Sequence, residues 1–374
     1  MIWTSKEKAS LRRLLLSWYN KQKRDMPWRQ TSDPYRIVLS EFMLQQTRVD
    51  TVIPYYERFI SAFPTVHTLA DADLDEVLKL WEGLGYYSRA RNLHRAAMAI
   101  SREHNGSVPE DYDSLFALPG FGPYTTAAVL SIAYAKQHAV LDGNVIRVLA
   151  RLQANEKETD RPAMKRALQH TADELLNGKR PGDHNQAMME LGATVCKPRN
   201  PVCPTCPIQR HCRASARGVV DRIPRKSSAK PRPERTYAAA ILRQHDRYLV
   251  GRRKEQGLLG GLWEFPSREV DTAPRPDQIC DTVAAAAGVN SVAHRPFRTV
   301  KHAYTHFTAV VHAYQCDWVA GEPASDEHDR FEWADEQELQ DYACSRITRK
   351  LVVALFDDRS QTILDLDRHK ERMA

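Results

Sequence analysis

The sequence predicts a mainly α-helical domain followed by a smaller α+β domain. Apolar residues recur at helical spacing through residues 1–217, a segment rich in proline and basic residues interrupts them at 218–235, and strand-like alternation follows. A chain of 374 residues is long enough for two domains. We therefore expect domains at 1–217 and 236–360, joined by an extended basic linker at 218–235.

The first domain is predicted to be a series of helices. Leu11, Leu15 and Trp18 lie on one face of a helix over 5–20. A second helix begins at Asp33-Pro34, because aspartate is a good N-cap and proline suits the first turn. Further helices are predicted at 51–63, 73–81, 87–103, 113–117, 124–135, 144–152, 162–176 and 184–195.

The second domain mixes strands with helices. The predicted strands lie at 236–243, 247–253 and 307–315, and a glycine-rich bend at 260–266 leads into another. The predicted helices lie at 277–287, 335–341 and 346–357. This combination defines an α+β domain.

The composition excludes several classes of protein. With 42% hydrophobic and 27% charged residues, the chain is neither disordered nor collagen-like. No stretch approaches the roughly 18 consecutive apolar residues of a membrane helix, so no membrane partner is expected. The N-terminus leads directly into a helix pattern without the features of a secretion signal, and we expect a cytoplasmic protein.

The charge is unevenly distributed along the chain. Residues 1–217 carry 30 Lys and Arg against 23 Asp and Glu, residues 218–235 carry 6 against 2, and residues 236–374 carry 18 against 22. A basic domain and a basic linker are consistent with a polyanionic partner such as nucleic acid. The alternative is a solvated basic face without such a partner.

Four of the seven cysteines form a compact pattern, Cys196-x6-Cys203-x2-Cys206-x5-Cys212. Clustered cysteines in a long cytosolic chain favour a metal site over disulfides. Four thiolates at this spacing suit either zinc or an iron–sulfur cluster, and the spacing alone does not decide between them. Buried free cysteines are a further alternative.

A glycine-rich turn enters a helix within residues 118–126, with Gly120 and Gly122 separated by one residue. Glycine lets the backbone approach a phosphate closely, and the free N–H groups of a helix start point toward it. The turn therefore fits a helix-hairpin-helix element for DNA, although most turns of this composition are only turns.

Two carboxylates have positions that suit catalysis. Asp142 directly precedes an apolar-periodic helix, where an N-cap is the common role, and the same carboxylate can also face a cleft. Glu41 lies in mid-helix one turn from Leu44, and an apolar setting would raise its pKa as a general acid requires. The alternative is a solvated glutamate at a helix edge. Upstream, Trp28 and Arg29 offer a stacking plane and a cation.

Together these stretches resemble the endonuclease III superfamily of DNA glycosylases and, within it, the adenine DNA glycosylase family. The resemblance covers residues 8–213 and is carried by MPWRQTSDPYRIVLSEFMLQQTRV, WEGLGYYSRARNL, LPGFGPYTTAAVLS, VLDGNVIRVLAR, NQAMMELGATVC and the cysteine pattern. It implies a helix-hairpin-helix glycosylase domain with an iron–sulfur loop at 196–212. In that loop, a [4Fe–4S] cluster would be held by Cys196, Cys203, Cys206 and Cys212.

The resemblance also implies roles for individual residues. Glu41 would protonate N7 of adenine, and Asp142 would stabilise the oxocarbenium-like sugar. Tyr124 and Asn144 would hold the site, and Tyr124 stands where bifunctional relatives carry a Schiff-base lysine, so a β-lyase step is not expected. Trp28, Arg29 and Glu190 are implied to line the adenine pocket, Gln46 and Tyr86 to wedge into the duplex, and Leu44, Gly120 and Gly122 to contact DNA.

The second domain resembles the MutT-like (Nudix-like) domain of the same family, with the matching stretch GLWEFP at 261–266. Residues 277–284 contain none of the glutamates that a Nudix hydrolase needs for its metal, so no diphosphohydrolase activity is expected. The resemblance implies a reader of 8-oxoguanine instead. Tyr304, Thr305 and His306 stand where the family carries Phe-Ser-His.

We therefore expect a monofunctional adenine DNA glycosylase of base excision repair. It would act as a monomer on double-stranded DNA that contains adenine opposite 8-oxoguanine or guanine, associated with the nucleoid of a bacterium. A catalytically silent lesion sensor is the second hypothesis, which Glu41 and Asp142 together oppose. A nucleotide hydrolase run by the second domain is the third, which the missing glutamates oppose.

Overall fold

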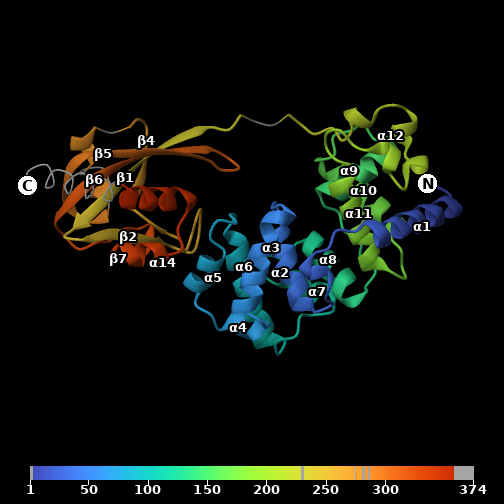
Figure 1. Cartoon of the computed structure of the whole chain (residues 1–374), viewed down its shortest axis with the longest axis horizontal. Helices are drawn as coiled ribbons and strands as arrows, with labels where there is room; N and C mark the ends of the chain where they lie inside the picture. The colour runs from blue at the N-terminus through green and yellow to red at the C-terminus, as the bar shows by residue number, and fades with distance from the viewer. Residues whose placement is uncertain (1–2, 229–230, 274, 280–282, 285–286, 358–374) are drawn as a thin grey trace, which may run out of the picture. The chain divides into compact units, whose positions relative to one another are not determined.

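The computed structural model describes residues 3–228, 231–273, 275–279, 283–284 and 287–357 (Figure 1). The chain forms two compact units. We call them the helical unit (Met1–Asp71 and Asn92–Ala229) and the sheet unit (Ala72–Arg91 and Lys230–Ala374). The short segment Ala72–Arg91 thus groups with the sheet unit, although its sequence neighbours on both sides are helical. No helix in the described part of the chain is long and apolar enough to cross a membrane.

Helices joined by short loops build the helical unit, and every helix predicted there is present. Their bounds are α1 (Ser5–Gln22), α2 (Pro34–Leu44), α3 (Val49–Ala62), α4 (Val66–Ala70), α6 (Ser88–Glu103), α7 (Tyr112–Ala117), α8 (Pro123–Tyr134), α9 (Gly143–Gln153), α10 (Pro162–Leu175), α11 (Pro181–Thr194) and α12 (Arg213–Ala216). The first turn of α6 belongs to the segment that groups with the sheet unit. The sequence did not predict α4 and α12, because such short helices show no apolar period.

Side-chain caps fix several helix starts. Thr4 and Glu7 form a reciprocal capping box at the start of α1. At α2, the Asp33 carboxylate accepts a hydrogen bond from the Tyr35 N–H at 2.9 Å, as the sequence predicted. Caps of this kind are worth about 1 kcal/mol each. Helix α11 begins at Pro181, earlier than predicted, because proline is well tolerated in the first helical turn.

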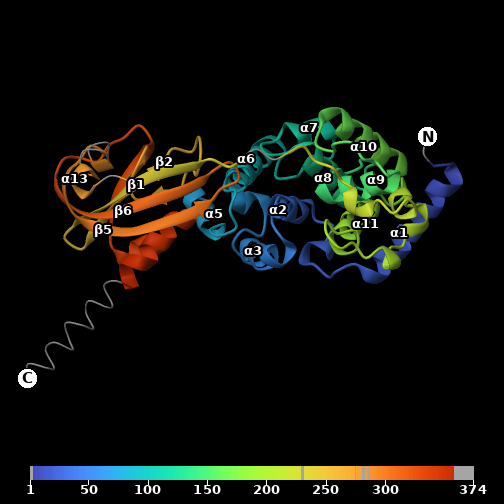
Figure 2. The same ribbon diagram turned by 90° about the horizontal axis from the view of Figure 1, so that it is seen from above.

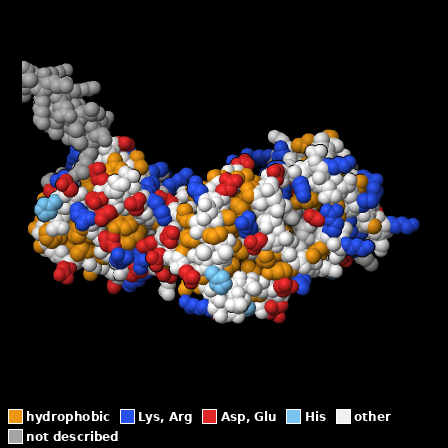
Figure 3. Space-filling view, turned by 60° about the horizontal axis from the view of Figure 1, so that its bottom comes forward, with side chains coloured by type: hydrophobic (Ala, Val, Ile, Leu, Met, Phe, Trp, Pro, Cys, Tyr) orange, Lys and Arg blue, Asp and Glu red, His pale blue; other side chains and the backbone are white. Residues whose placement is uncertain are grey.

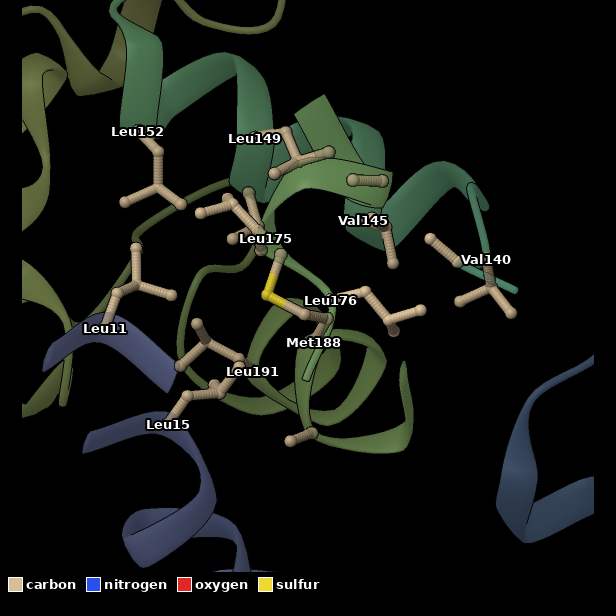
Figure 4. Close-up of a cluster of buried hydrophobic side chains, with 14 of the residues drawn as sticks. Leu11, Leu15, Val140, Val145, Leu149, Leu152, Leu175, Leu176, Met188 and Leu191 are labelled. Carbon is tan, nitrogen blue, oxygen red and sulfur yellow. The ribbon is translucent and has the colours of Figure 1, made fainter. Parts of the chain in front are cut away.

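The core of the helical unit lies where α1, α9, α10 and α11 pack together (Figure 4). Leu11 of α1, Leu149 of α9 and Met188 of α11 are almost completely buried there. Each such side chain contributes roughly 1.5–3 kcal/mol of transfer free energy. This packing fixes α9 and α11, and these two helices carry or adjoin the candidate site residues Asp142 and Glu190.

A tight hairpin at 118–122 joins α7 to α8 and confirms the predicted helix-hairpin-helix. Gly120 has a φ of +80°, and a Cβ there would lie 2.7 Å from the Asn92 Cβ and 2.7 Å from a ring carbon of Phe42. Only glycine fits this position. Gly122 is the N-cap residue of α8, and a Cβ there would meet nothing within 4 Å. The start of α8 is therefore open to a ligand.

The sheet unit contains a mixed sheet with the strand order β3-β2-β1-β6-β5 (Figure 2). β1 and β6 run parallel and β5 and β6 run antiparallel, while β4 pairs with β1 and β7 pairs with β2. The strands are β1 (Glu234–Gln244), β2 (Arg247–Arg253), β3 (Trp263–Glu264), β4 (Ser267–Val270), β5 (Asn290–Ala303), β6 (Thr308–Ala320) and β7 (His328–Ala334). The helices are α5 (Leu74–Leu80), α13 (Pro276–Ile279), α14 (Glu336–Asp341) and a further helix at 346–357.

The sequence analysis missed β5 and β7. Pro296 and several basic residues interrupt the apolar alternation of β5, and proline is compatible with a strand only at an edge or an irregularity. β5 is the last strand of the order, and its register with β6 shifts between Pro296 and Arg298. The helix predicted at 277–287 begins as α13, and part of the prediction lies outside the described residues.

The first part of the predicted linker packs on the helical unit. Ile223 is 1% exposed, and the buried Arg151 side chain donates hydrogen bonds to the carbonyl oxygens of Val220 and Ile223. Further on, the Thr159 N–H donates to the Arg225 carbonyl oxygen at 2.9 Å. The extended segment is therefore anchored through Arg225.

Candidate active site

A cavity of about 160 Å³ gathers most of the site residues that the sequence analysis predicted in the helical unit. Side chains from α2, α8 and α11 line it, together with residues at the start of α9 and in the short 3₁₀ turn η1 (Pro27–Arg29). The predicted residues in its lining are Trp28, Arg29, Glu41, Leu44, Tyr124, Asp142, Asn144 and Glu190. Residues distant in sequence thus form one site.

Glu41 is a carboxylic acid in the interior of the helical unit. Only 5% of the residue is exposed, and its Oε2 has no hydrogen-bond partner among the described residues. The pKa of Glu41 is raised to about 7, chiefly by burial; the charge of Asp142 also raises it, while Tyr124 and Arg29 lower it. A side chain that stays protonated near neutral pH can serve as a general acid. The alternative of a solvated helix-edge glutamate is wrong.

Asp142 is the N-cap of α9 and also lines the cavity, so the cap role and a role in the cavity are compatible. Its Oδ1 accepts a hydrogen bond from the Val145 N–H at 2.7 Å, and its Oδ2 accepts one from the Asn144 side-chain amide at 2.8 Å. Burial raises the pKa of Asp142, but these donors favour the ionised form and oppose the rise. The Oε2 atom of Glu41 has no such donor.

A buried arginine connects this carboxylate to the cysteine loop. Nη2 of Arg147 donates to Oδ1 of Asn144 at 2.8 Å, which fixes the amide that faces Asp142. Nε of the same arginine donates to the Cys196 carbonyl oxygen at 2.7 Å. A continuous chain of hydrogen bonds therefore runs from the loop to the site.

Tyr124 lies in the first turn of α8, and its hydroxyl sits beside the Glu41 carboxyl. The hydroxyl also donates to the sulfur of Met189, with 3.2 Å between O and S. Burial and the neighbouring carboxylates of Glu41 and Asp142 raise the pKa of Tyr124 well above its usual value, so the phenol stays neutral. No lysine is found among the described residues that line the cavity.

Glu190 closes one side of the cavity in a three-residue ion cluster. Arg24 donates to both of its carboxylate oxygens, at 2.7 and 3.0 Å, and Arg29 donates to Oε2 at 2.9 Å. Burial alone would raise the pKa of Glu190, but the hydrogen bonds and charges of the two arginines together lower it. Trp28 is 7% exposed and packs edge-on against Tyr56, so it both lines the cavity and belongs to the core.

The four clustered cysteines follow α11 in a loop with two short 3₁₀ turns, η2 (Cys203–Thr205) and η3 (Gln209–His211). Burial, together with the three other cysteine sulfurs nearby, raises the pKa of Cys206 to about 12. Nη1 of Arg151 donates to the Cys196 sulfur at 3.2 Å. None of the four forms a disulfide. Among the described residues, no group of three or more His, Cys, Asp or Glu side chains is arranged to hold a metal ion.

Gln46 lies outside the cavity lining, in the turn after α2. It is exposed and has a φ of +58°, a conformation that residues other than glycine rarely adopt. Functional sites often hold such conformations. The side chain of Gln46 is thus accessible to solvent. A residue that inserts into a duplex must be accessible in this way.

Tyr86 and Thr305 meet within the sheet unit. Their hydroxyl oxygens are 3.1 Å apart, and Tyr86 is 45% exposed. Both residues line a cavity of about 460 Å³ together with His306. The predicted duplex wedge and the predicted reader loop are therefore neighbours in this unit.

The three residues of the predicted reader loop have different settings. Tyr304 packs inward, with its ring 5.1 Å from that of Phe307 and 4.7 Å from that of His302. Its N–H donates to the Phe307 carbonyl oxygen at 2.8 Å, which closes a turn. Thr305 and His306 are exposed at the tip of this turn. Tyr304 therefore anchors the turn, and the other two can reach a ligand.

Arg24, Gln186 and Met189 are among the cavity-lining residues that sequence reasoning did not assign to the site. Gln186 and Met189 lie one turn and one residue before Glu190 on α11, so the helical spacing around Glu190 could have indicated them. Arg24 stands in a run of charged residues that looks like a solvated surface. Its pairing with Glu190 depends on the tertiary fold.

The helix-hairpin-helix fold, with a buried acid and a capping aspartate in one cavity, defines a base excision DNA glycosylase. Residues 39–173 match the family described as "HhH-GPD superfamily base excision DNA repair protein", and residues 237–354 match the family described as "NUDIX domain". The structure of a thermostable thymine-DNA glycosylase is similar, with a TM-score of 0.53 and 29% identity. The structural match covers 57% of this chain and 98% of the thymine-DNA glycosylase chain.

The curated relatives identify the family within this class. The adenine DNA glycosylase of Homo sapiens is 33% identical, over 98% of this chain and 79% of its own length. That of Rattus norvegicus is 35% identical, over 92% of this chain and 77% of its own length. The chain belongs to the adenine DNA glycosylase family.

Proposed function

We propose that the protein excises adenine paired with 8-oxoguanine or guanine in duplex DNA, by hydrolysis of the N-glycosidic bond, and leaves an abasic site. Adenine excision in base excision repair follows from family membership. The nature of the mispair and the chemical route are our proposal. We also propose that it acts as a monomer. We place it in the cytoplasm, at the nucleoid of a bacterium.

One observation carries the proposed chemistry: the unpartnered Oε2 of Glu41 lies in the same cavity as the hydrogen-bonded Asp142. Such a buried oxygen without a partner costs free energy until a ligand satisfies it. A flipped adenine offers a ring nitrogen that can accept the Glu41 proton. The two carboxyl groups differ in environment, and this difference supports Glu41 as the acid and Asp142 as the stabiliser.

The reaction then proceeds in a few balanced steps. Adenine leaves the base stack and enters the cavity, at a cost of a few kcal/mol for unstacking. Glu41 gives its proton to N7, the C1′–N9 bond breaks, and adenine leaves as a neutral base. Ionised Asp142 stabilises the positive charge that develops on the sugar. Water adds its oxygen to C1′ and loses a proton, which restores the protonated acid. With no lysine in the described cavity lining, water is the expected nucleophile.

The surrounding residues suit the recognition of a flipped base. The Arg24–Glu190–Arg29 cluster presents fixed polar groups at the cavity wall, and Trp28 presents an aromatic edge. Gln46 and Tyr86 are exposed side chains in left-handed turns, which suits insertion into a duplex. The open start of α8 at Gly122 suits a phosphate. Lys and Arg side chains are spread over the helical part of the face shown in Figure 3, as binding to a polyanion requires.

We assign recognition of the base opposite adenine to the sheet unit. Thr305 and His306 are exposed and carry groups that can donate or accept hydrogen bonds, and Tyr304 holds their turn in place. We propose that these two side chains distinguish 8-oxoguanine from guanine, which differ at O8 and at N7–H. Recognition by one or two hydrogen bonds is typically worth about 1–3 kcal/mol.

The cysteine loop is proposed to hold a [4Fe–4S] cluster on Cys196, Cys203, Cys206 and Cys212. The four sulfurs lie near one another, and Arg151 donates a hydrogen bond to the sulfur of Cys196. Such a hydrogen bond favours the thiolate form of the cysteine. Each thiolate of such a cluster binds a different iron atom, so the sulfurs need not meet at a single ion. When bound, the cluster supplies a rigid cross-link that orders the loop. Purified protein is expected to be yellow-brown and to contain iron; a colourless, fully active protein that contains zinc would contradict this.

A gel assay with labelled duplexes tests the activity. A duplex with adenine opposite 8-oxoguanine is expected to lose adenine and to break only after alkali, because water leaves the strand intact. Borohydride is expected to trap little covalent complex, since trapping requires an amine nucleophile. Strand breakage without alkali, or trapping that depends on one lysine, would exclude the hydrolytic mechanism. A duplex with adenine opposite thymine serves as the negative control.

A further inference from the structure

Tyr124 has one hydroxyl proton and two acceptors within reach. The sulfur of Met189 is 3.2 Å from the Tyr124 oxygen, and the Glu41 carboxyl lies beside the same hydroxyl. All three residues line the active-site cavity. A thioether sulfur is a weak acceptor, whereas a carboxylate is a strong one. The direction of the Tyr124 hydroxyl therefore depends on whether Glu41 is protonated.

We propose that Met189 is a positioning residue: its sulfur accepts the Tyr124 proton and thereby turns the Tyr124 oxygen toward Glu41 as an acceptor. In this arrangement the protonated Glu41 donates to Tyr124, and Tyr124 donates to Met189. The chain of donors stores the Glu41 proton in a defined direction inside the cavity. This inference rests on the proposed role of Glu41 as the acid, and it assigns a task to a residue that the sequence analysis did not single out.

Other charged groups around Glu41 and Tyr124 also influence the titration of Glu41. Asp142 faces both residues from the start of α9, and Arg29 faces Glu41 from η1. From α11, Glu190 faces the same cavity in its ion cluster with Arg24 and Arg29. A substitution at Met189 leaves all of these charges in place. A change in the titration of Glu41 would then not come from a lost or added charge.

The substitution Met189→Leu tests the proposal, because it keeps the side-chain volume and removes the acceptor. Without the sulfur, the Tyr124 proton turns to the Glu41 carboxylate and stabilises its ionised form. The pKa of Glu41 then falls, and excision at alkaline pH is lost earlier. We expect the alkaline limb of the single-turnover rate profile to move down by about 0.5–1 pH unit, as a weak hydrogen bond allows.

The neighbouring methionine provides a matched control. Met188 is 3% exposed and belongs to the hydrophobic core, so Met188→Leu makes the same chemical change outside the cavity (Figure 4). This variant is expected to keep the wild-type pH profile. An equal shift in both variants would mean that loosened packing of α11 causes it, and the proposal would fall.

A second measurement removes the dependence on activity. The infrared band of the protonated Glu41 carboxyl, identified as the band that Glu41→Gln removes, can be titrated in DNA-free protein. Met189→Leu is expected to lower its midpoint, and the effect is expected to vanish when Tyr124→Phe is also present. An unchanged midpoint, or an equal shift without the hydroxyl, would overturn the proposal. A lowered midpoint with an unchanged rate profile would instead refute Glu41 as the acid.

Discussion

The side-chain amide of Asn144 donates a hydrogen bond of 2.8 Å to the carboxylate of Asp142. The amide cannot flip without loss, because its oxygen accepts from Nη2 of Arg147 at 2.8 Å. Arg147 is in turn held by the carbonyl oxygens of Gly192 and Cys196. The charged form of Asp142 thus depends on a donor whose orientation is fixed by the end of α11 and the cysteine loop.

Replacement of this donor is expected to weaken catalysis while the fold is kept. In Asn144→Ala the partly buried Asp142 retains the Val145 N–H but loses the side-chain amide donor, so its pKa rises and less of the ionised form is available. We expect a fall of roughly tenfold to a hundredfold in the single-turnover rate, as the loss of a hydrogen bond to a charged group suggests. Asn155→Ala, which removes an amide outside the cavity lining, is the control. Equal rates in the two variants would contradict the argument.

The two roles of Asp142 can be separated by a matched pair of caps. Asp142 caps α9 and Asp111 caps α7, each through a hydrogen bond from a backbone N–H. Asparagine is a good N-cap, so Asp142→Asn and Asp111→Asn are both expected to fold and to bind DNA. Only Asp142→Asn is expected to lose excision, since the amide carries no charge to stabilise the sugar cation. Normal excision by Asp142→Asn would exclude a catalytic role for Asp142 and show that it acts only as the N-cap of α9.

Glu41→Gln is expected to be nearly inactive and yet more stable than the wild type at pH 8. Gln cannot donate the proton, and general acid catalysis is worth about 10²–10⁴-fold. Because the folded-state pKa of about 7 lies above the ordinary value of 4.5, the folded state holds this proton between those pH values while the unfolded state releases it. Rising pH through that window therefore destabilises the wild type, by on the order of 1–3 kcal/mol.

Denaturant titrations at pH 5 and pH 8 measure this difference. The variant and the wild type should be closest at pH 5, where the cost of ionising the buried acid is absent. A stability difference that is the same at both pH values would show that the pKa of Glu41 is not raised in the folded protein. Activity of the variant near the wild-type single-turnover rate would separately exclude the acid role.

Much of the helical unit could be predicted, because its order is local. Amphipathic spacing, aspartate caps and proline in first turns act within a few residues, and they locate α1, α2 and α9 closely. The same local logic indicated that Glu41 lies on an apolar helix face, and its burial bears this out. A helix start also predicted the cap at Asp142.

The features that escaped prediction depend on distant partners. The pairing of Arg24 with Glu190 joins residues that no periodicity relates. Strand β5 is an edge strand whose own sequence has no clear apolar alternation. Its pairing with β6 defines it as a strand. The sequence did not distinguish Tyr304 from its loop neighbours Thr305 and His306. Only the structure shows that the ring of Tyr304 packs near that of Phe307. Contacts of this kind become visible only with the tertiary structure.

The reader turn of the sheet unit gives the last prediction. Thr305→Ala and His306→Ala remove exposed side chains while Tyr304 still holds the turn, so the fold is expected to stay intact. The rate with adenine opposite 8-oxoguanine should then fall by roughly 10–100-fold relative to the rate opposite guanine, as the loss of one or two hydrogen bonds in recognition suggests. Thr299→Ala, an exposed threonine on β5, is the control and should leave the ratio unchanged. Both duplexes are compared at one salt concentration, because lost phosphate contacts would weaken binding to both alike. An unchanged ratio in both reader variants would mean that other residues read the partner base and that the assignment to Thr305 and His306 is wrong.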